Sequence, residues 1–264
     1  MFVRTGTVRT EGGAMGVTFR RRITWPKNDL LLPAELYNVN VPAGLSSMDV
    51  RVPNIVDTNR MMQLAPGSNS SSSGSLSLTE GLVKSDLSVS FPNPAAQWRR
   101  VPVPGAKDSN RGPCQFQFTG GEVILDFPLE IYLLKTAEID PNDDLSVQIF
   151  ACLYEHELLH VLDALDIANN WLPIRLNAEP TVARYLMQGQ PYVYGTASML
   201  IAPLEQEFRT FITNTIQVAI FNLWATESNR RESLRDAPAQ YKIVQDKVDA
   251  LRGKQINRPH SAPQ

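Results

Sequence analysis

Residues 140–170 read "DPNDDLSVQIFACLYEHELLHVLDALDIANN", and this stretch decides the kind of fold that the chain can adopt. Asp143, Asp144 and Ser146 are typical helix-start residues, and Asn169–Asn170 is a possible stop. The stretch therefore predicts one long helix, which is apolar nearly all round and so suited to burial. Within it, "LYEHELLHVLD" (153–163) contains two of the chain's three histidines.

The sequence on either side of this helix divides into two portions of different character. Residues 1–136 hold short alternating runs bounded by Pro and Gly, which predict strands. The clearest runs are "GVTFRRRITW" (16–25), "LSVSF" (87–91), "CQFQFTG" (114–120) and "GEVILDF" (121–127). A Ser/Gly tract at 65–77 has almost nothing to bury and predicts a flexible loop. Residues 137–252 read as helical, which gives an α+β fold with a β-rich first portion.

Three further helices are expected in the second portion. One follows Pro180, and two others span about 203–226 and 230–252. The first of these two carries apolar residues at helical spacing, as a core helix does. The second is strongly charged and reads as a solvated helix or a partner-binding surface. The polar tail, 253–264, is expected to be disordered.

Composition excludes several classes of protein. The 264 residues are 43% hydrophobic and 20% charged, as in a globular chain, and the net charge of −2 predicts neither a nucleic-acid nor a membrane partner. We find no apolar run of transmembrane length and no N-terminal signal peptide. We therefore expect a cytoplasmic protein, or one exported without such a peptide. Cys114 and Cys152 are too few for a disulfide scaffold, so both are expected to be reduced.

The spacing of the two histidines suits a metal ion. Four residues along a helix bring His156 and His160 to within about 40° of each other on one face, one turn apart. Both imidazoles can then reach one ion, while Glu157 on the flank can reach a water molecule beside it. This is the content of the H-E-x-x-H pattern: two neutral ligands and one general base.

A simpler interpretation is that both histidines are core residues satisfied by hydrogen bonds. Against it, so apolar a helix should avoid the block Glu155–His156–Glu157 unless something offsets the cost of burying it. A bound metal ion would do so.

"HELLH" (156–160) in an apolar helix resembles the active-site helix of the zincin metallopeptidases. The resemblance covers this helix and about thirty residues beyond it, and is closest to the gluzincin branch. It implies Zn²⁺ as the cofactor, a peptide or protein as the substrate, His156 and His160 as ligands and Glu157 as the general base.

A catalytic zinc ion usually has three protein ligands, so a third is required. Gluzincins place a glutamate on the next helix at about the spacing of Glu179, which follows His160 after eighteen intervening residues. Glu179 is thus the first choice, although Ala178 is inserted into the local Asn-Glu pattern of that branch. Pro180 suits a first helical position, so Glu179 is alternatively a helix-start acid.

Two aspartates and one histidine are the alternatives. Asp163 lies on the face of the histidines, but about 10 Å along the axis from His156, so it fits better as an acceptor for the ring N–H of His160. Asp166 occupies the position of the third ligand in metzincin-like enzymes, which requires the helix to break. His260 lies in the tail, four residues from the end of the sequence, and is a poor candidate.

Other groups could assist catalysis. Tyr192 and Tyr194, in a loop flanked by Gly and Pro, are candidate donors to an oxyanion, with Arg184 and Tyr185 as alternatives. Many zincins lay the substrate against an edge strand, and residues 120–135 are the candidate because Pro128 suits an edge.

Two other functions remain open. The chain is alternatively a non-catalytic structural or assembly protein, as in a phage or secretion particle, that retains a zincin-like helix. The second alternative is an injected protease toxin, because "HELLHVL" (156–162) resembles helices of such toxins. Zinc content and its loss on His156→Ala distinguish a metal site from a metal-free helix.

Overall fold

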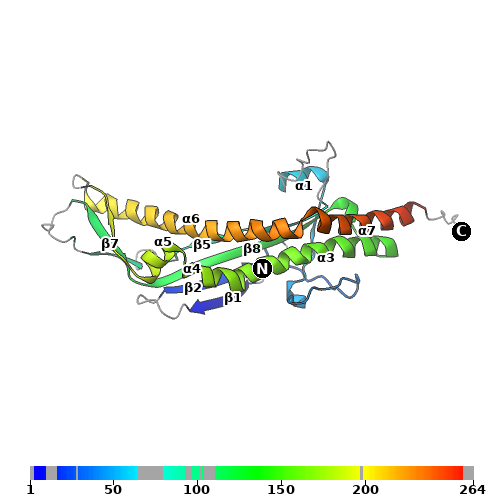
Figure 1. Ribbon diagram of the computed structural model, residues 1–264, viewed down its shortest axis with the longest axis horizontal. Helices are drawn as coiled ribbons and strands as arrows, with labels where there is room; N and C mark the ends of the chain where they lie inside the picture. The colour runs from blue at the N-terminus through cyan, green and yellow to red at the C-terminus, as the bar shows by residue number, and fades with distance from the viewer. Residues whose placement is uncertain are drawn as a thin grey trace.

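The computed structural model in Figure 1 describes residues 3–9, 17–27, 29–64, 80–92, 97–101, 103, 111–196 and 199–257. The expected α+β class is confirmed: all described strands but one lie in the first portion, and the long helices lie in the second. The predicted Ser-rich loop at 65–77 lies outside the described residues. None of the helices that are described has the length and apolarity to cross a membrane.

The larger sheet is built around one long strand. Within the described residues it has six strands, ordered β1-β2-β8-β3, with β4 and β5 also paired to β8. Their bounds are β1 Val3–Arg9, β2 Val17–Thr24, β3 Asn54–Val56, β4 Gly81–Ser85, β5 Ser88–Ser90 and β8 Gly121–Leu134. The first half of β8 lies between β2 and β5, and its second half between β3 and β4.

The prediction that residues 120–135 form an edge strand is wrong, because β8 is the centre of the sheet. Pro128 is tolerated there for a local reason. It pairs with Thr24, the last residue of β2, and on its other side it faces the gap between β4 and β5. Its carbonyl accepts from Asp86 N (3.3 Å) in that gap, so its missing N–H interrupts no continuous ladder.

A smaller sheet joins the two portions of the chain. It has the order β6-β7-β9 and is antiparallel, with bounds β6 Trp98–Val101, β7 Cys114–Phe118 and β9 Tyr192–Tyr194. Because β9 comes from the helical portion, the C-terminal residues complete a sheet that the N-terminal residues begin.

The predicted long helix is α3, Asp144–Asp166. Asp143 caps it by accepting a hydrogen bond from Leu145 N (3.1 Å). The helix does not stop at Asn169–Asn170: a π-turn (Ile167–Trp171) leads directly into α4, Leu172–Leu176. The short elements that complete the described fold are η1 Ser47–Asp49, α1 Thr58–Leu64, η2 Lys135–Ala137, α5 Pro180–Val182 and the π-turn Ala183–Met187.

Two C-terminal helices follow α3 along its length in the opposite chain direction (Figure 1). α6 spans Ile201–Arg235 and α7 spans Pro238–Ile256, so the expected boundary near 226–230 lies inside α6. The true break follows from Pro238, since a residue before proline is disfavoured in the helical region. Ala237 accordingly has ψ 134°.

The core lies where α3 and α6 pack against the two sheets. Tyr154, Leu158 and Val161 of α3 are fully buried, as is one face of α6 at a spacing of four residues. That face consists of Leu204, Phe208, Ile212, Ile216 and Ile220. α7 continues into the first residues of the predicted tail, as far as Ile256, and residues 258–264 lie outside the described part of the chain.

Candidate metal centre

The two motif histidines point to the same place. His156 and His160 lie one turn apart on α3, and their Nε2 atoms are 3.4 Å apart. Their side chains are 10% and 16% exposed. The helix therefore presents both imidazoles at the edge of the core, where solvent still reaches them.

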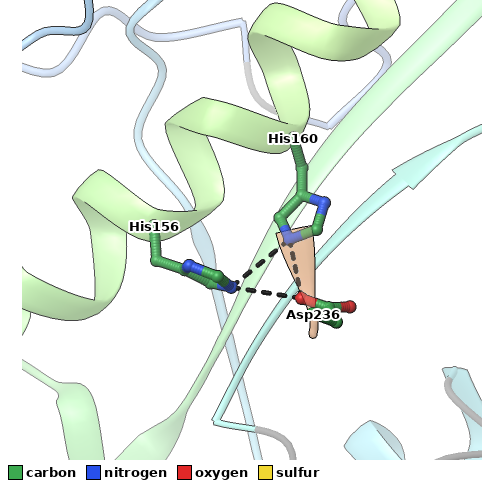
Figure 2. Close-up of side chains that lie close together, drawn as sticks. All are labelled: His156, His160 and Asp236. Carbon is green, nitrogen blue, oxygen red and sulfur yellow. Dashed lines mark hydrogen bonds and ion pairs between the residues drawn. The ribbon is translucent and has the colours of Figure 1, made fainter. Parts of the chain in front are cut away.

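A third group, which sequence reasoning missed, completes the cluster. Asp236 Oδ1 lies 3.3 Å from His156 Nε2 and 3.2 Å from His160 Nε2 (Figure 2). One atom from each of the three side chains falls within 4.8 Å of the others, the only such group of three among the described His, Cys, Asp and Glu residues.

Local chain geometry explains how Asp236 comes to lie there. Its backbone N–H donates to Glu232 O (2.8 Å), which closes the last turn of α6. The Ala237–Pro238 step then turns the chain, so Asp236 sits at the break between α6 and α7, directly over the histidines. A carboxylate at a helix C-terminus is disfavoured by the helix dipole, so this position calls for a positive partner.

The spacing of the three atoms fits a tetrahedral ion. Donors about 2.0–2.1 Å from zinc, at tetrahedral angles, are separated from one another by roughly 3.3 Å. The three separations are 3.2, 3.3 and 3.4 Å. If both imidazoles donate to Asp236, neither has a lone pair on Nε2 for the other, so hydrogen bonding alone does not account for the 3.4 Å contact.

Glu157 lies beside this cluster and is almost wholly buried, with 4% exposure. Burial raises the pKa of its carboxyl to about 7, against the opposing charges of His160 and His156. Its side chain packs on Gly81 of β4, where an added Cβ would lie only 2.3 Å from Glu157 Oε1. The strand therefore fixes the position of the carboxylate.

The charges of the cluster support one another. Burial alone would lower the pKa of His160, but the hydrogen bond to Asp236 and the nearby Glu157 raise it. Burial alone would raise the pKa of Asp236, but the hydrogen bonds from His156 and His160 lower it well below its usual range. The three-residue cluster thus favours an ionised carboxylate.

A cavity of about 1020 Å³ opens over the cluster. α3, β4, the end of α6 and the start of α7 line it, and among the lining residues are His156, Glu157, His160, Glu232, Asp236 and Tyr241. The volume matches that of a site for a small molecule or a few residues of a peptide.

One wall of the cavity is a strand edge. Within the described residues β4 pairs only with β8, and Leu134 N donates to Glu80 O. The alternation of an antiparallel ladder then turns the backbone groups of Gly81 and Val83 away from β8, and both residues line the cavity.

Glu179, the predicted third ligand, is not brought to the histidines. It is the N-cap of α5, where its carboxylate accepts from Val182 N (2.6 Å). It neither joins the three-residue cluster nor lines the cavity. The helix-start interpretation of Glu179 describes what the structure shows, because Pro180 begins a short helix directly after it.

The two aspartates of α3 also serve other partners. Asp163 accepts from Arg235 Nε (2.6 Å) and Nη2 (3.2 Å), and Asp166 pairs with Arg231 Nη1 (2.7 Å). The expected hydrogen bond from His160 to Asp163 is therefore not formed. Because α3 does not break, Asp166 cannot turn back toward the two histidines.

Tyr192 and Tyr194 lie in strand β9 rather than in a loop, and their rings pack on Phe208 and Phe211. They are absent from the cavity lining. The tyrosine that lines the cavity is Tyr241 of α7, whose ring centroid is 6.4 Å from that of His156. Burial, and then the charges of Glu80, Glu157 and Asp236, raise the pKa of Tyr241, which favours the protonated phenol.

Comparison of the chain with protein-family models, with curated proteins and with solved structures gave no match. The geometry of the site is therefore the basis for any statement about function.

Proposed function

We propose that the protein is a zinc-dependent metallopeptidase of the zincin type. The observation that carries the proposal is the convergence of His156 Nε2, His160 Nε2 and Asp236 Oδ1 at the separations of a tetrahedral site. Glu157 follows His156 directly and lies at the same cavity, as a general base must.

Each residue has a distinct task in this proposal. His156, His160 and Asp236 would hold the ion, which when bound supplies Lewis acidity toward a water molecule and the scissile carbonyl. Glu157 accepts the proton of the attacking water and delivers it to the departing nitrogen. The phenol of Tyr241 is the candidate donor to the oxyanion that develops on the carbonyl.

A peptide is the substrate that suits the cavity wall. Gly81 and Val83 line the cavity beside Glu157, and among the described residues the edge of β4 away from β8 has no strand partner, so an extended chain can pair there. An added strand would place one peptide bond close to the histidines. This supports hydrolysis of a peptide bond over that of a smaller ester or amide.

The test begins with metal content and continues with hydrolysis. Protein purified without added metal is expected to contain one zinc per chain, and His156→Ala is expected to lose it. Glu157→Gln should retain the zinc and lose hydrolysis of a quenched-fluorescent peptide library, because its amide cannot accept the proton.

Three results would count against the proposal. Metal-free protein whose stability is unchanged by His156→Ala indicates core histidines. Zinc-bound protein without hydrolysis indicates a structural site, in keeping with a non-catalytic assembly protein. Full activity in Glu157→Gln removes the assigned base.

A further inference from the structure

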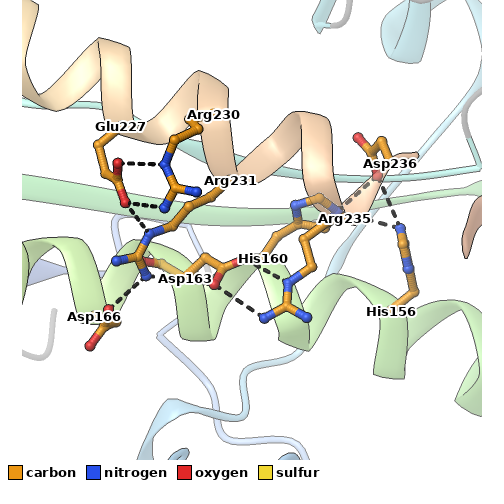
Figure 3. A network of polar contacts seen from close by, with 9 residues as sticks. All are labelled: His156, His160, Asp163, Asp166, Glu227, Arg230, Arg231, Arg235 and Asp236. Atoms are coloured by element: carbon orange, nitrogen blue, oxygen red, sulfur yellow. Dashed lines mark hydrogen bonds and ion pairs between the residues drawn. The ribbon is translucent and has the colours of Figure 1, made fainter.

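A row of ion pairs runs along the contact between α3 and α6 (Figure 3). We call it the charged ladder and define it as Glu227, Arg231, Asp166, Asp163 and Arg235. Arg231 Nε contacts Glu227 Oε1 at 2.8 Å, and Arg231 Nη1 contacts Asp166 Oδ2 at 2.7 Å. Arg235 Nε contacts Asp163 Oδ2 at 2.6 Å.

The charged ladder differs from an ordinary surface pair in burial and geometry. The side chains of Glu227, Arg231 and Asp163 are 6%, 15% and 17% exposed, whereas those of Arg235 and Asp166 are 34% and 40% exposed. Arg235 donates through two nitrogens to both oxygens of Asp163, which fixes the direction of the side chain as well as its distance. Such pairs hold two helices in a defined register more firmly than exposed pairs do.

The charged ladder ends next to the three-residue cluster of His156, His160 and Asp236. Arg235 directly precedes Asp236, and Asp163 lies one turn beyond His160 on α3. The Asp163–Arg235 ion pair therefore links the residue that precedes Asp236 on α6 to the helical turn that follows His160 on α3. Rotation or sliding of α6 by one residue would move its end by about 1.5 Å and 100° and would carry Asp236 away from the histidines.

The last turn of α6 needs such a support. Asp236 stands at a helix end, next to a proline break, and is 43% exposed. Helix ends of this kind fray, and a frayed end does not hold a ligand in place. The buried face of α6, by contrast, ends at Trp224 and Glu227, more than two turns before Asp236.

We propose that the Asp163–Arg235 ion pair positions Asp236 as the third metal ligand and thereby sets the metal affinity of the site. The inference rests on the proposed metal site but not on the proposed hydrolysis. Arg235 and Asp163 act through Asp236 and are positioning residues.

The experiment compares two arginines of the same helix. Arg235→Gln removes the pair with Asp163. Arg230→Gln, the matched control, removes the same charge from α6, but Arg230 pairs with Glu227 of its own helix. Zinc affinity is measured on the full chain by competition with a chromophoric chelator. We expect the affinity to fall about tenfold or more in Arg235→Gln, and to change less than twofold in Arg230→Gln.

Three further tests separate positioning from general stability. Cobalt in place of zinc reports the ligand set through its visible absorption, which should change in Arg235→Gln as Asp236 detaches. Arg235→Lys keeps the charge but not the fork, so it should restore part of the affinity. In a chain that already carries Asp163→Asn, Arg235→Gln should have little further effect.

The outcomes are separable from those of the proposed function. If the wild-type chain binds no zinc, the metal site itself fails. If it binds zinc and Arg235→Gln binds it equally well, with the same cobalt spectrum, the positioning role is overturned. If Arg235→Gln does not fold, Asp163→Asn decides, because it breaks the same pair from the other helix. A normal zinc affinity in that variant overturns the proposal.

Discussion

At the scale of single residues, Glu157 depends on a glycine from a distant strand. Gly81→Ala would place a methyl carbon 2.3 Å from Glu157 Oε1 and 2.9 Å from its Cγ, so the whole buried side chain would have to shift. We expect the free energy of unfolding to fall by roughly 1–3 kcal/mol, as in other overpacked sites. Peptide hydrolysis should fall at least tenfold while zinc content is retained. Urea unfolding, metal analysis and the peptide assay test this together.

Gly253 offers a control for that substitution. It lies within α7, and an added Cβ there meets nothing within 4 Å. Gly253→Ala should raise the free energy of unfolding by about 0.5–1 kcal/mol through helix propensity alone. If Gly81→Ala proved as harmless as Gly253→Ala, the close contact with Glu157 would not position the base.

Removing the side chain of Asp236 and removing that of Glu179 should have different effects on zinc affinity and on stability. Asp236→Ala should weaken zinc binding by at least about tenfold, because it removes a direct donor. Glu179→Ala should leave zinc affinity unchanged and cost about 1 kcal/mol of stability, because it removes the N-cap bond to Val182 N. Chelator competition and urea unfolding of both variants distinguish them, and the reverse pattern would restore Glu179 as the ligand.

At the scale of elements, the ion pairs of Glu227 with Arg230 and Arg231, all on α6, should make the C-terminal part of this helix sensitive to acid. The ion pairs with Arg230 and then Arg231 together depress the pKa of Glu227 to about 2, against the opposing effect of burial. Because the folded-state pKa lies below the unfolded value of about 4.3, the pairs stabilise the fold fully above that pH. Their contribution is lost as the pH falls from about 4.3 to 2.

Glu227→Gln isolates this effect. The variant should be less stable than wild type at pH 7, by at most about 3 kcal/mol, and by less in practice because Arg230 is exposed and screened. The difference between the two proteins should shrink as the pH falls toward 2. Urea unfolding at pH 7, 4 and 3 measures it, and a difference independent of pH would mean that Glu227 acts by packing alone.

Elements also show where sequence reasoning succeeds. His156, Glu157 and His160 share one helix, so helical periodicity alone brings them together. Asp236 lies on another helix, and no local pattern relates it to them. A partial signal was present in "RDAP" (235–238), because Pro238 predicts a helix end at Asp236. What periodicity could not supply is the register of α6 on α3, because it depends on contacts between distant parts of the chain, the charged ladder among them.

For the strands too, the sequence predicts where each one lies in the chain but not how they are ordered in the sheet. The runs that form β2, β5, β7 and β8 are recognised from alternation and composition. Their order is not, because the position of β8 depends on which partners flank it. From the sequence alone Pro128 therefore predicts an edge, although it lies on a central strand, where the neighbour of β8 changes from β5 to β4.

At the scale of the whole molecule, metal binding and folding should be coupled. The three donors come from two helices separated by a long stretch of chain, so the cluster exists only when α3 and the α6–α7 break are docked. An ion that binds this folded state and not the unfolded chain stabilises the fold, by about 2.7 kcal/mol at a free concentration of 100 times Kd. For a chain of this size, that corresponds to a rise in Tm of roughly 5–10 °C.

Thermal unfolding of the metal-stripped chain, titrated with zinc, tests this coupling. Two imidazoles and one carboxylate favour zinc over magnesium, so magnesium at the same concentration should leave Tm unchanged. His156→Ala should fold without zinc and show no rise when zinc is added, because two of the three donors cannot hold the ion tightly. Equal rises in wild type and His156→Ala would place the stabilising ion elsewhere, and the absence of any rise in wild type would remove the metal centre from the folded protein.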